Sequence, residues 1–204
     1  MDKKKDCSRK IQRRQDSLNN YLDELVKKYS RLDVVRIDLL YKKEARSKVT
    51  IESFDKDLNR LNNNRRGNEI FDNVVGYVSK MEQGDKVNDH LHAHLVFFIN
   101  GQKSKDRSGS SIARKIGNYW EQTITKGNGS HHNCNIKKYK SNGLGRVDYN
   151  DKTKIQIVKE NTLSYLCKGE QSIITPEGKK IKALRRGGMP KQTNKGRPRK
   201  SKPC

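Results

Sequence analysis

The sequence feature that most constrains the fold is the segment HLHAHLVFFIN, residues 90–100. Its nearly continuous run of bulky and β-branched residues, followed by Asn-Gly, is typical of a buried strand. Because side chains alternate along a strand, His90, His92 and His94 share one face. Buried imidazoles need partners, and imidazole is the commonest metal-ligating side chain. The pattern therefore favours a metal site over histidines that only pack in the core.

The preceding segment, residues 70–82, has the alternation of a second strand and is joined to the histidine strand by a short polar connection. If the two form an antiparallel hairpin, Glu82 lies about 5 Å from His90 and His92. A carboxylate is the ligand that a divalent ion preferring oxygen, Mg²⁺ or Mn²⁺, needs beside imidazoles. Glu82 and the histidines on this strand are therefore the candidate metal ligands.

Composition indicates the kind of partner. The formal net charge is +23 in 204 residues, and such a surface attracts polyanions, above all nucleic acid. No apolar run is long enough to span a bilayer and the start is unlike a secretory signal, so we expect no membrane association. The four cysteines are not closely paired, which favours the reducing cytoplasm and argues against disulfides.

The length predicts one domain with appendages. We expect residues 1–14 to be a basic disordered arm, 15–190 the folded domain and 191–204 a basic tail. The tail contains Lys195-Gly-Arg197-Pro-Arg199, which resembles the AT-hook core that enters A·T-rich minor grooves. A generic basic tail is the alternative. In either case we expect Lys195, Arg197 and Arg199 to contact DNA.

Residues 185–190, Arg-Arg-Gly-Gly-Met-Pro, predict a turn in which Arg185 and Arg186 bind phosphate. Apolar periodicity predicts the remaining elements. These are helices over residues 18–29, 50–61, 112–120 and 159–168, a strand over 31–41, loop over 127–135, and a short extended piece over 154–159.

Single residues carry three further expectations. Trp120 is expected to anchor its helix on the sheet rather than to stack on a base. Asp38 either pairs with Arg36 or contributes a carboxylate to the site, and both readings stay open. Tyr165 and Lys168 are three residues apart and so emerge on one side of a helix.

These residues together suggest one reaction. A metal ion acts as a Lewis acid on a phosphodiester, and a tyrosine is a competent nucleophile for phosphorus. The pKa of a free tyrosine, about 10, keeps the phenolate scarce near neutral pH, so a cation must favour it. The metal or Lys168 would supply that positive charge to Tyr165.

The chain resembles the HUH endonucleases, in particular the replication initiators of filamentous phages and their prophage-borne bacterial relatives. The resemblance rests on a glutamate strand (GYVSKMEQG), the His-x-His strand (HAHLVFFING), YLCKG and RRGG, in the family's order, and spans about residues 31–190. It implies an α+β fold with a central four- or five-stranded antiparallel sheet and helices on one face. It also implies that His92, His94 and Glu82 hold the metal, and it leaves His90 open as a third histidine ligand, a support for another ligand, or a solvated side chain.

The resemblance further implies that Tyr165 cuts one strand of origin DNA, forming a 5′-phosphotyrosyl link and a free 3′-OH that starts rolling-circle replication. Lys168 would be its electrostatic partner. Asn161 and Gly169 occupy the positions one helical turn from Tyr165, so a single-tyrosine mechanism is expected. Single-stranded or origin DNA, a host helicase and a host polymerase are the expected partners, near the nucleoid of a bacterial cell. The alternatives are a non-catalytic nucleic-acid-binding module, or a relaxase or transposase with the same chemistry.

Overall fold

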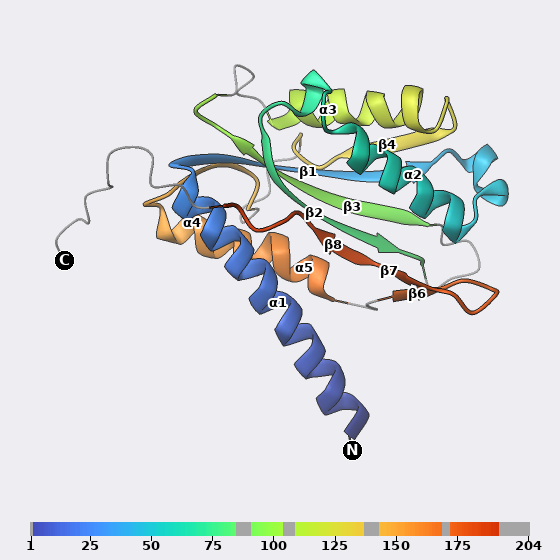
Figure 1. Ribbon diagram of the computed structural model, residues 1–204, viewed down its shortest axis with the longest axis horizontal. Coiled ribbons are helices and arrows are strands. Elements are labelled where there is room, and N and C mark those ends of the chain that lie inside the picture. The colour runs from blue at the N-terminus through green and yellow to red at the C-terminus, as the bar shows by residue number, and fades with distance from the viewer. Residues whose placement is uncertain (1, 85–90, 104–108, 137–142, 169–171, 192–204) are drawn as a thin grey trace.

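The computed structural model describes residues 2–84, 91–103, 109–136, 143–168 and 172–191. Within them the chain forms an α+β fold built around one antiparallel sheet with helices packed against it (Figure 1). This confirms the fold class predicted from the sequence.

The central sheet has the strand order β4-β1-β3-β2-β8, and β5 pairs with the other half of β1. Strands β6 and β7 form a separate two-stranded ribbon. The strands are β1 (Arg31–Tyr41), β2 (Val74–Glu82), β3 (His92–Asn100), β4 (Gly129–Asn133), β5 (Gly145–Asp148), β6 (Ser172–Ile174), β7 (Lys180–Lys182) and β8 (Leu184–Arg186).

The sequence patterns predicted the three central strands, β1, β2 and β3. β1 has the predicted bounds, and β2 and β3 form the predicted antiparallel pair with Glu82 opposite His92. β2 starts at Val74 rather than at residue 70, because Ile70 and Phe71 belong to a short 3-10 helix whose first turn is capped by Asn68. Residues 129–133, expected to be loop, form β4 by pairing with β1.

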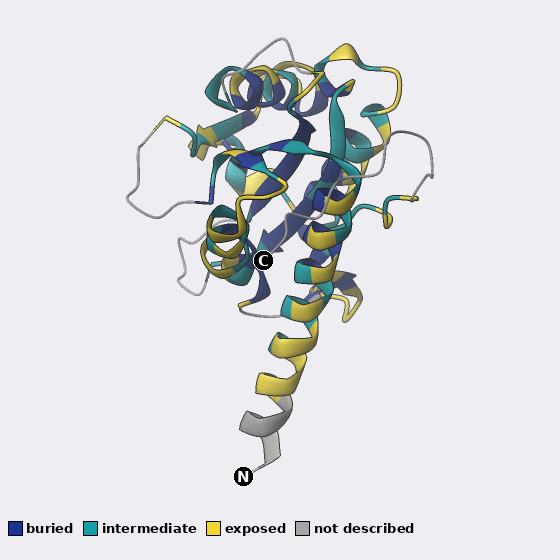
Figure 2. Cartoon of the chain, turned by 90° about the vertical axis from the view of Figure 1, so that its left-hand side faces the viewer, coloured by how far each residue is buried: buried dark blue, intermediate teal, exposed yellow. Residues whose placement is uncertain are grey.

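The helices cover both faces of the sheet, whereas the resemblance implied one. They are α1 (Asp2–Lys28), η1 (Lys43–Lys48), α2 (Ile51–Asn64), η2 (Glu69–Phe71), α3 (Gly109–Tyr119), η3 (Trp120–Ile124), α4 (Lys152–Ile157), η4 (Val158–Leu163) and α5 (Ser164–Cys167). One core cluster joins Leu95 and Phe97 of β3 to α2, α3 and η3, and the other joins Val96 and Phe98 to α1, η4 and α5. Figure 2 shows the buried strands between these two layers. The reason is that β3 is apolar on both of its faces, and both must be shielded from water.

Two helical segments differ from the prediction. Helix α1 begins at Asp2, so the expectation of a disordered arm over residues 1–14 is wrong, and its first half projects beyond the sheet (Figure 1). Residues 152–167 form α4, η4 and α5 in unbroken succession, so the extended piece expected over 154–159 is helical. Among the residues described, no helix has the length and apolar character needed to cross a bilayer.

The expected anchoring role of Trp120 is confirmed. Trp120 is fully buried against the sheet and its indole Nε1 donates a hydrogen bond to the carbonyl of Leu40 on β1, at 2.9 Å. Thr50 caps α2, because its side chain accepts a hydrogen bond from the backbone of Ser53. The Trp120 contact fixes η3 on the face of the sheet opposite to the histidines, where α2 also packs.

Candidate metal centre

Two neighbouring strands bring together the three predicted metal ligands. Lys80 and Glu82 on β2 lie directly opposite His94 and His92 on β3. Glu82 Oε2 lies 3.6 Å from His92 Nε2 and 3.4 Å from His94 Nε2. The alternation of side chains along β2 and β3, which predicted that these three residues lie together, therefore also determines their distances from one another.

Asp38 on β1 fixes the orientation of His94. Its Oδ1 lies 2.7 Å from His94 Nδ1, and its carboxylate also accepts two hydrogen bonds from the guanidinium of Arg36. Arg36 Nη2 is 3.1 Å from the same histidine nitrogen, but a guanidinium can only donate. A carboxylate can only accept, so Nδ1–H donates to Asp38 in the 2.7 Å contact, and Nε2 faces Glu82. Asp38 is thus both the ion-pair partner of Arg36 and a member of the site.

The carboxylates of the site are held in their charged form. Hydrogen bonds from His92 and His94 hold the pKa of Glu82 well below its usual range. Burial alone would raise the pKa of Asp38, but the bonds from His94 and Arg36 outweigh it and lower the value. For His94, burial favours the neutral ring, yet the bonds to Asp38 and Glu82 raise its pKa. Two negative charges beside the imidazoles favour a cation at this place.

The geometry fits a divalent metal ion. One ligand atom from each of Glu82, His92 and His94 lies within 4.8 Å of the others, and no second such group occurs in the described part of the chain. Atoms that share one ion at about 2.1 Å each are about 3 Å apart, so small side-chain movements suffice. Two imidazoles and one carboxylate leave coordination positions open for a substrate.

Tyr165 on α5 lies against this group. Its Oη is 3.4 Å from His94 Nε2, and the two rings meet edge to face with centroids 5.2 Å apart. The guanidinium carbon of Arg36 lies 4.6 Å from the centre of the tyrosine ring. The side chain remains 40% exposed, so a substrate can reach the hydroxyl.

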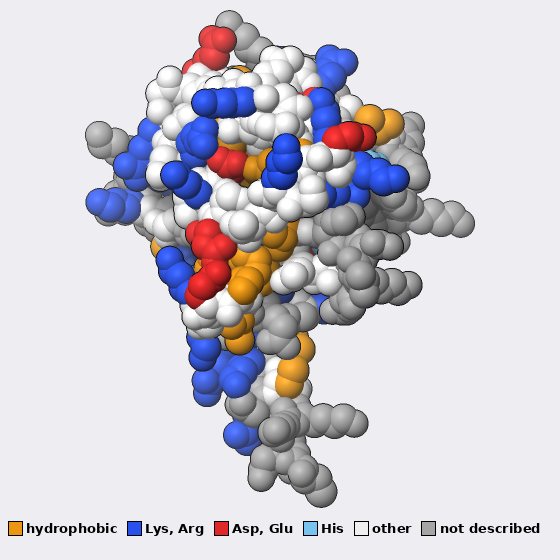
Figure 3. Space-filling model, turned by 90° about the vertical axis from the view of Figure 1, so that its right-hand side faces the viewer, with side chains coloured by type: hydrophobic (Ala, Val, Ile, Leu, Met, Phe, Trp, Pro, Cys, Tyr) orange, Lys and Arg blue, Asp and Glu red, His pale blue; other side chains and the backbone are white. Residues whose placement is uncertain are grey.

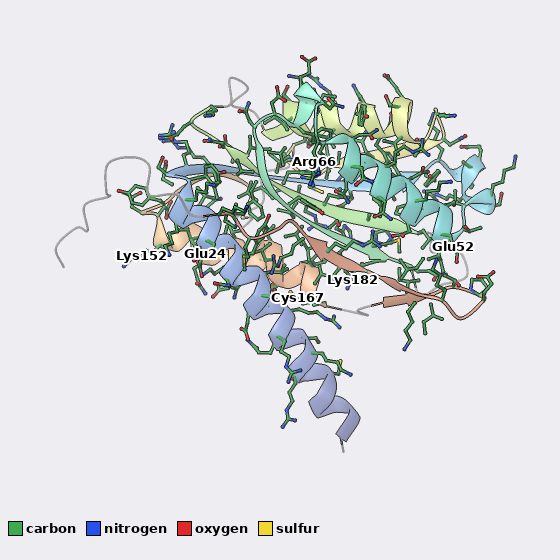
Figure 4. All side chains as sticks on the ribbon, viewed as in Figure 1. Glu24, Glu52, Arg66, Lys152, Cys167 and Lys182 are labelled. Carbon is green, nitrogen blue, oxygen red and sulfur yellow. The ribbon has the colours of Figure 1, made fainter. Side chains whose placement is uncertain are left out.

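Lys168 is the residue at which the chain leaves α5. The helix ends at Cys167, and Lys168 caps it with backbone angles φ −70° and ψ 159°, so the chain turns away after this residue. The position of its side chain beside Tyr165 stays a prediction. The carbonyl of Lys168 accepts a hydrogen bond of 2.7 Å from the ammonium of Lys80. Figure 4 labels Cys167 at this end of α5, beside α1.

Sequence reasoning assigned no role to Lys80 and gave Arg36 only as a partner of Asp38, although both residues lie at the site. Lys80 is almost fully buried, and its Nζ lies 4.0 Å from Glu82 Oε1. The available signal was a lysine on the same strand face as Glu82, and an arginine two residues before Asp38. Neither signal reveals how close the side chain comes to the histidines, because that depends on strand register.

The other predicted residues lie elsewhere. Arg185 and Arg186 are on the edge strand β8, where Arg186 is opposite Val78 of β2. His90 and the tail residues Lys195, Arg197 and Arg199 fall outside the described residues.

Fold and site together define an α+β protein with a candidate metal centre of two histidines and one glutamate on its central antiparallel sheet. The chain belongs to the YagK/YfjJ C-terminal domain family, whose model matches residues 2–181. Searches of curated proteins and of solved structures found no match.

Proposed function

We propose that this protein is a metal-dependent endonuclease of the HUH type that nicks one DNA strand with Tyr165 and thereby starts rolling-circle replication. The observation that carries the proposal is the position of the Tyr165 hydroxyl, 3.4 Å from His94 Nε2 at the edge of the candidate metal group. A nucleophile and a Lewis acid must both reach the same phosphodiester, and this separation allows it.

In the proposed reaction Tyr165 Oη forms a bond to phosphorus and the bond between phosphorus and O3′ breaks. The proton lost by the phenol is balanced by the proton that O3′ takes up. The products are a 5′-phosphotyrosyl link and a free 3′-OH. The bound metal, Mg²⁺ or Mn²⁺, would withdraw charge from a non-bridging phosphate oxygen.

The residues around Tyr165 supply the remaining requirements. Arg36, whose guanidinium carbon lies 4.6 Å from the centre of the Tyr165 ring, would stabilise negative charge on the phenolic oxygen and on the phosphate. Lys80 holds the end of α5 through the carbonyl of Lys168, which keeps the tyrosine against the histidines. The side chain of Lys168, at the C-terminal cap of α5, stays a proposed electrostatic partner of the Tyr165 phenolate.

The test is covalent capture. The protein is incubated with Mn²⁺ and a pool of single-stranded oligonucleotides that contains every sequence of the length of a nick site, and a protease-sensitive adduct is sought on a denaturing gel. We expect an adduct with the wild type and none with Tyr165→Phe or with His92→Ala/His94→Ala. Tyr149→Phe is the matched control, because Tyr149 is also 40% exposed but lies outside the site.

An adduct that survives Tyr165→Phe would place the nucleophile elsewhere. DNA binding that is unaffected by chelator, without an adduct on any sequence, would favour the non-catalytic nucleic-acid-binding module. Initiator, relaxase and transposase share the covalent step. The sequence recovered in the adduct distinguishes them, because it shows whether the preferred nick site is found at a replication origin, a transfer origin or a transposon end.

A further inference from the structure

A second surface, separate from the metal group, is strongly basic. A groove of about 870 Å³ lies between helix α1 and the edge strand β8. Six cationic residues contribute to its lining, namely Lys10, Arg13, Arg14, Lys182, Arg185 and Arg186. None of the described residues that line it is acidic. Such a concentration of one charge focuses the field toward a polyanion.

The tertiary structure assembles this groove from the two ends of the domain. Arg186 of β8 donates to Ser17 Oγ of α1 at 3.4 Å, and its guanidinium lies 5.2 Å from the centre of the Tyr21 ring. Arg14 of α1 donates to the carbonyl of Cys167 at 3.1 Å. These contacts hold α1 beside β8 and beside the helix of Tyr165, so the groove is a built part of the fold.

One of the lining cations is paired with an acidic residue beyond the lining, because Arg185 forms an ion pair with Asp55 of α2. Lys10, Arg13 and Lys182 are exposed. Figure 3 shows Lys and Arg side chains where α1 projects beyond the sheet. At Gly187 a Cβ atom would lie 2.5 Å from Tyr21 Oη, so the absence of a side chain lets the backbone here lie close to α1.

The groove also lies close to the metal group. Leu184 in its wall is directly opposite Lys80, which is directly opposite His94. Neighbouring strands are about 4.8 Å apart, so Leu184 and His94 are separated by about 10 Å. At a rise of about 3.4 Å per nucleotide, that distance corresponds to about three nucleotides of one strand.

We propose that the groove between α1 and β8 binds the phosphate backbone of the DNA strand that flanks the nick site. The position of the nick rests on the proposed function, but binding of phosphates by the groove does not. Because the contacts are made by lysines, arginines and glycine backbone, binding in the groove is independent of base sequence.

The experiment measures binding of a fluorescently labelled single-stranded oligonucleotide by anisotropy, with the full chain, in EDTA, over a series of salt concentrations. The groove variant is Lys10→Gln/Arg13→Gln/Lys182→Gln. The matched control is Lys43→Gln/Lys56→Gln/Lys126→Gln, which removes the same charge from exposed positions elsewhere. Circular dichroism checks that both variants keep the wild-type fold.

We expect the groove variant to bind more weakly, with a plot of log affinity against log salt that is shallower by about 2, from about 0.7 per lost phosphate contact. The control should stay close to the wild type. Equal losses in both variants would overturn the proposal, because net charge alone would then explain binding. Loss of binding to phosphatidylserine vesicles with unchanged DNA affinity would overturn it in favour of a membrane surface. Since EDTA excludes nicking, failure of the groove proposal and failure of covalent capture are separate results.

Discussion

Replacing Asp38 by asparagine tests whether the second carboxylate of the site supports metal binding. The contact between Asp38 Oδ1 and His94 Nδ1 is short, at 2.7 Å, and the side chains are only 17% and 6% exposed. The Asp38→Asn variant keeps the size of the side chain but removes its negative charge. His94 then loses the partner that orients its ring and makes Nε2 more basic.

The expected magnitude follows from two arguments. A hydrogen bond to a charged group contributes about 1.5–3 kcal/mol, and each 1.4 kcal/mol is about tenfold in affinity. Loss of such a supporting contact commonly lowers metal affinity by about 10–100-fold. We therefore expect the dissociation constant for Mn²⁺ to rise by about 10–100-fold in Asp38→Asn.

The assay is calorimetric titration of the DNA-free protein with Mn²⁺. Asp148→Asn is the matched control, because Asp148 forms ion pairs with Arg31 and Arg146 on the same sheet, away from the histidines. His94→Ala, which removes a ligand, sets the scale of a complete loss. The reasoning is refuted if Asp38→Asn binds Mn²⁺ as tightly as Asp148→Asn does while His94→Ala fails to bind.

The remaining predictions concern stability and the C-terminal tail. Trp120→Ala should lower the free energy of unfolding in urea by about 3–5 kcal/mol, and a loss below about 1 kcal/mol would contradict its anchoring role. A Cβ atom at Gly76 would lie 2.8 Å from a leucine of α1, so Gly76→Ala should cost about 1–3 kcal/mol. Gly188→Ala, where nothing lies within 4 Å, should leave stability unchanged, and equal effects of the two changes would count against the packing argument. Deleting residues 191–204 should lower duplex affinity and its salt dependence. If the tail is an AT-hook, A·T-rich duplex will compete better than G·C-rich duplex for the intact protein.

Local periodicity accounts for the part of the site that could be predicted. Alternation over residues 31–41 and 92–100 places side chains on alternate faces whatever the strands pair with. The short connection between residues 82 and 92 makes an antiparallel hairpin the simplest pairing, which brings Glu82 opposite His92. Spacing along the chain was therefore enough to predict two histidines and a glutamate in one group.

The sequence also contained a pattern that predicts helices on both faces of the sheet, but the prediction followed the family resemblance instead. Strand β3 is apolar on both of its faces, a pattern typical of a strand that is covered on both sides. The prediction of helices on one face failed because it followed the resemblance instead of this pattern. Helix ends were less predictable, because they depend on distant partners. At the end of α5 the carbonyl of Lys168 accepts its hydrogen bond from the ammonium of Lys80, 88 residues away in the chain.

The sequence by itself determined the three central strands, the histidine face and the basic charge of this protein, since each depends on composition or on neighbours within a few residues. Only the tertiary structure decided that Asp38 orients His94, that Arg36 lies over the Tyr165 ring, and that α1 and β8 form one basic groove. These pairs join residues 56, 129 and about 170 positions apart in the chain. Strand register and helix packing bring such residues together, and both are set by how the whole core buries its apolar faces.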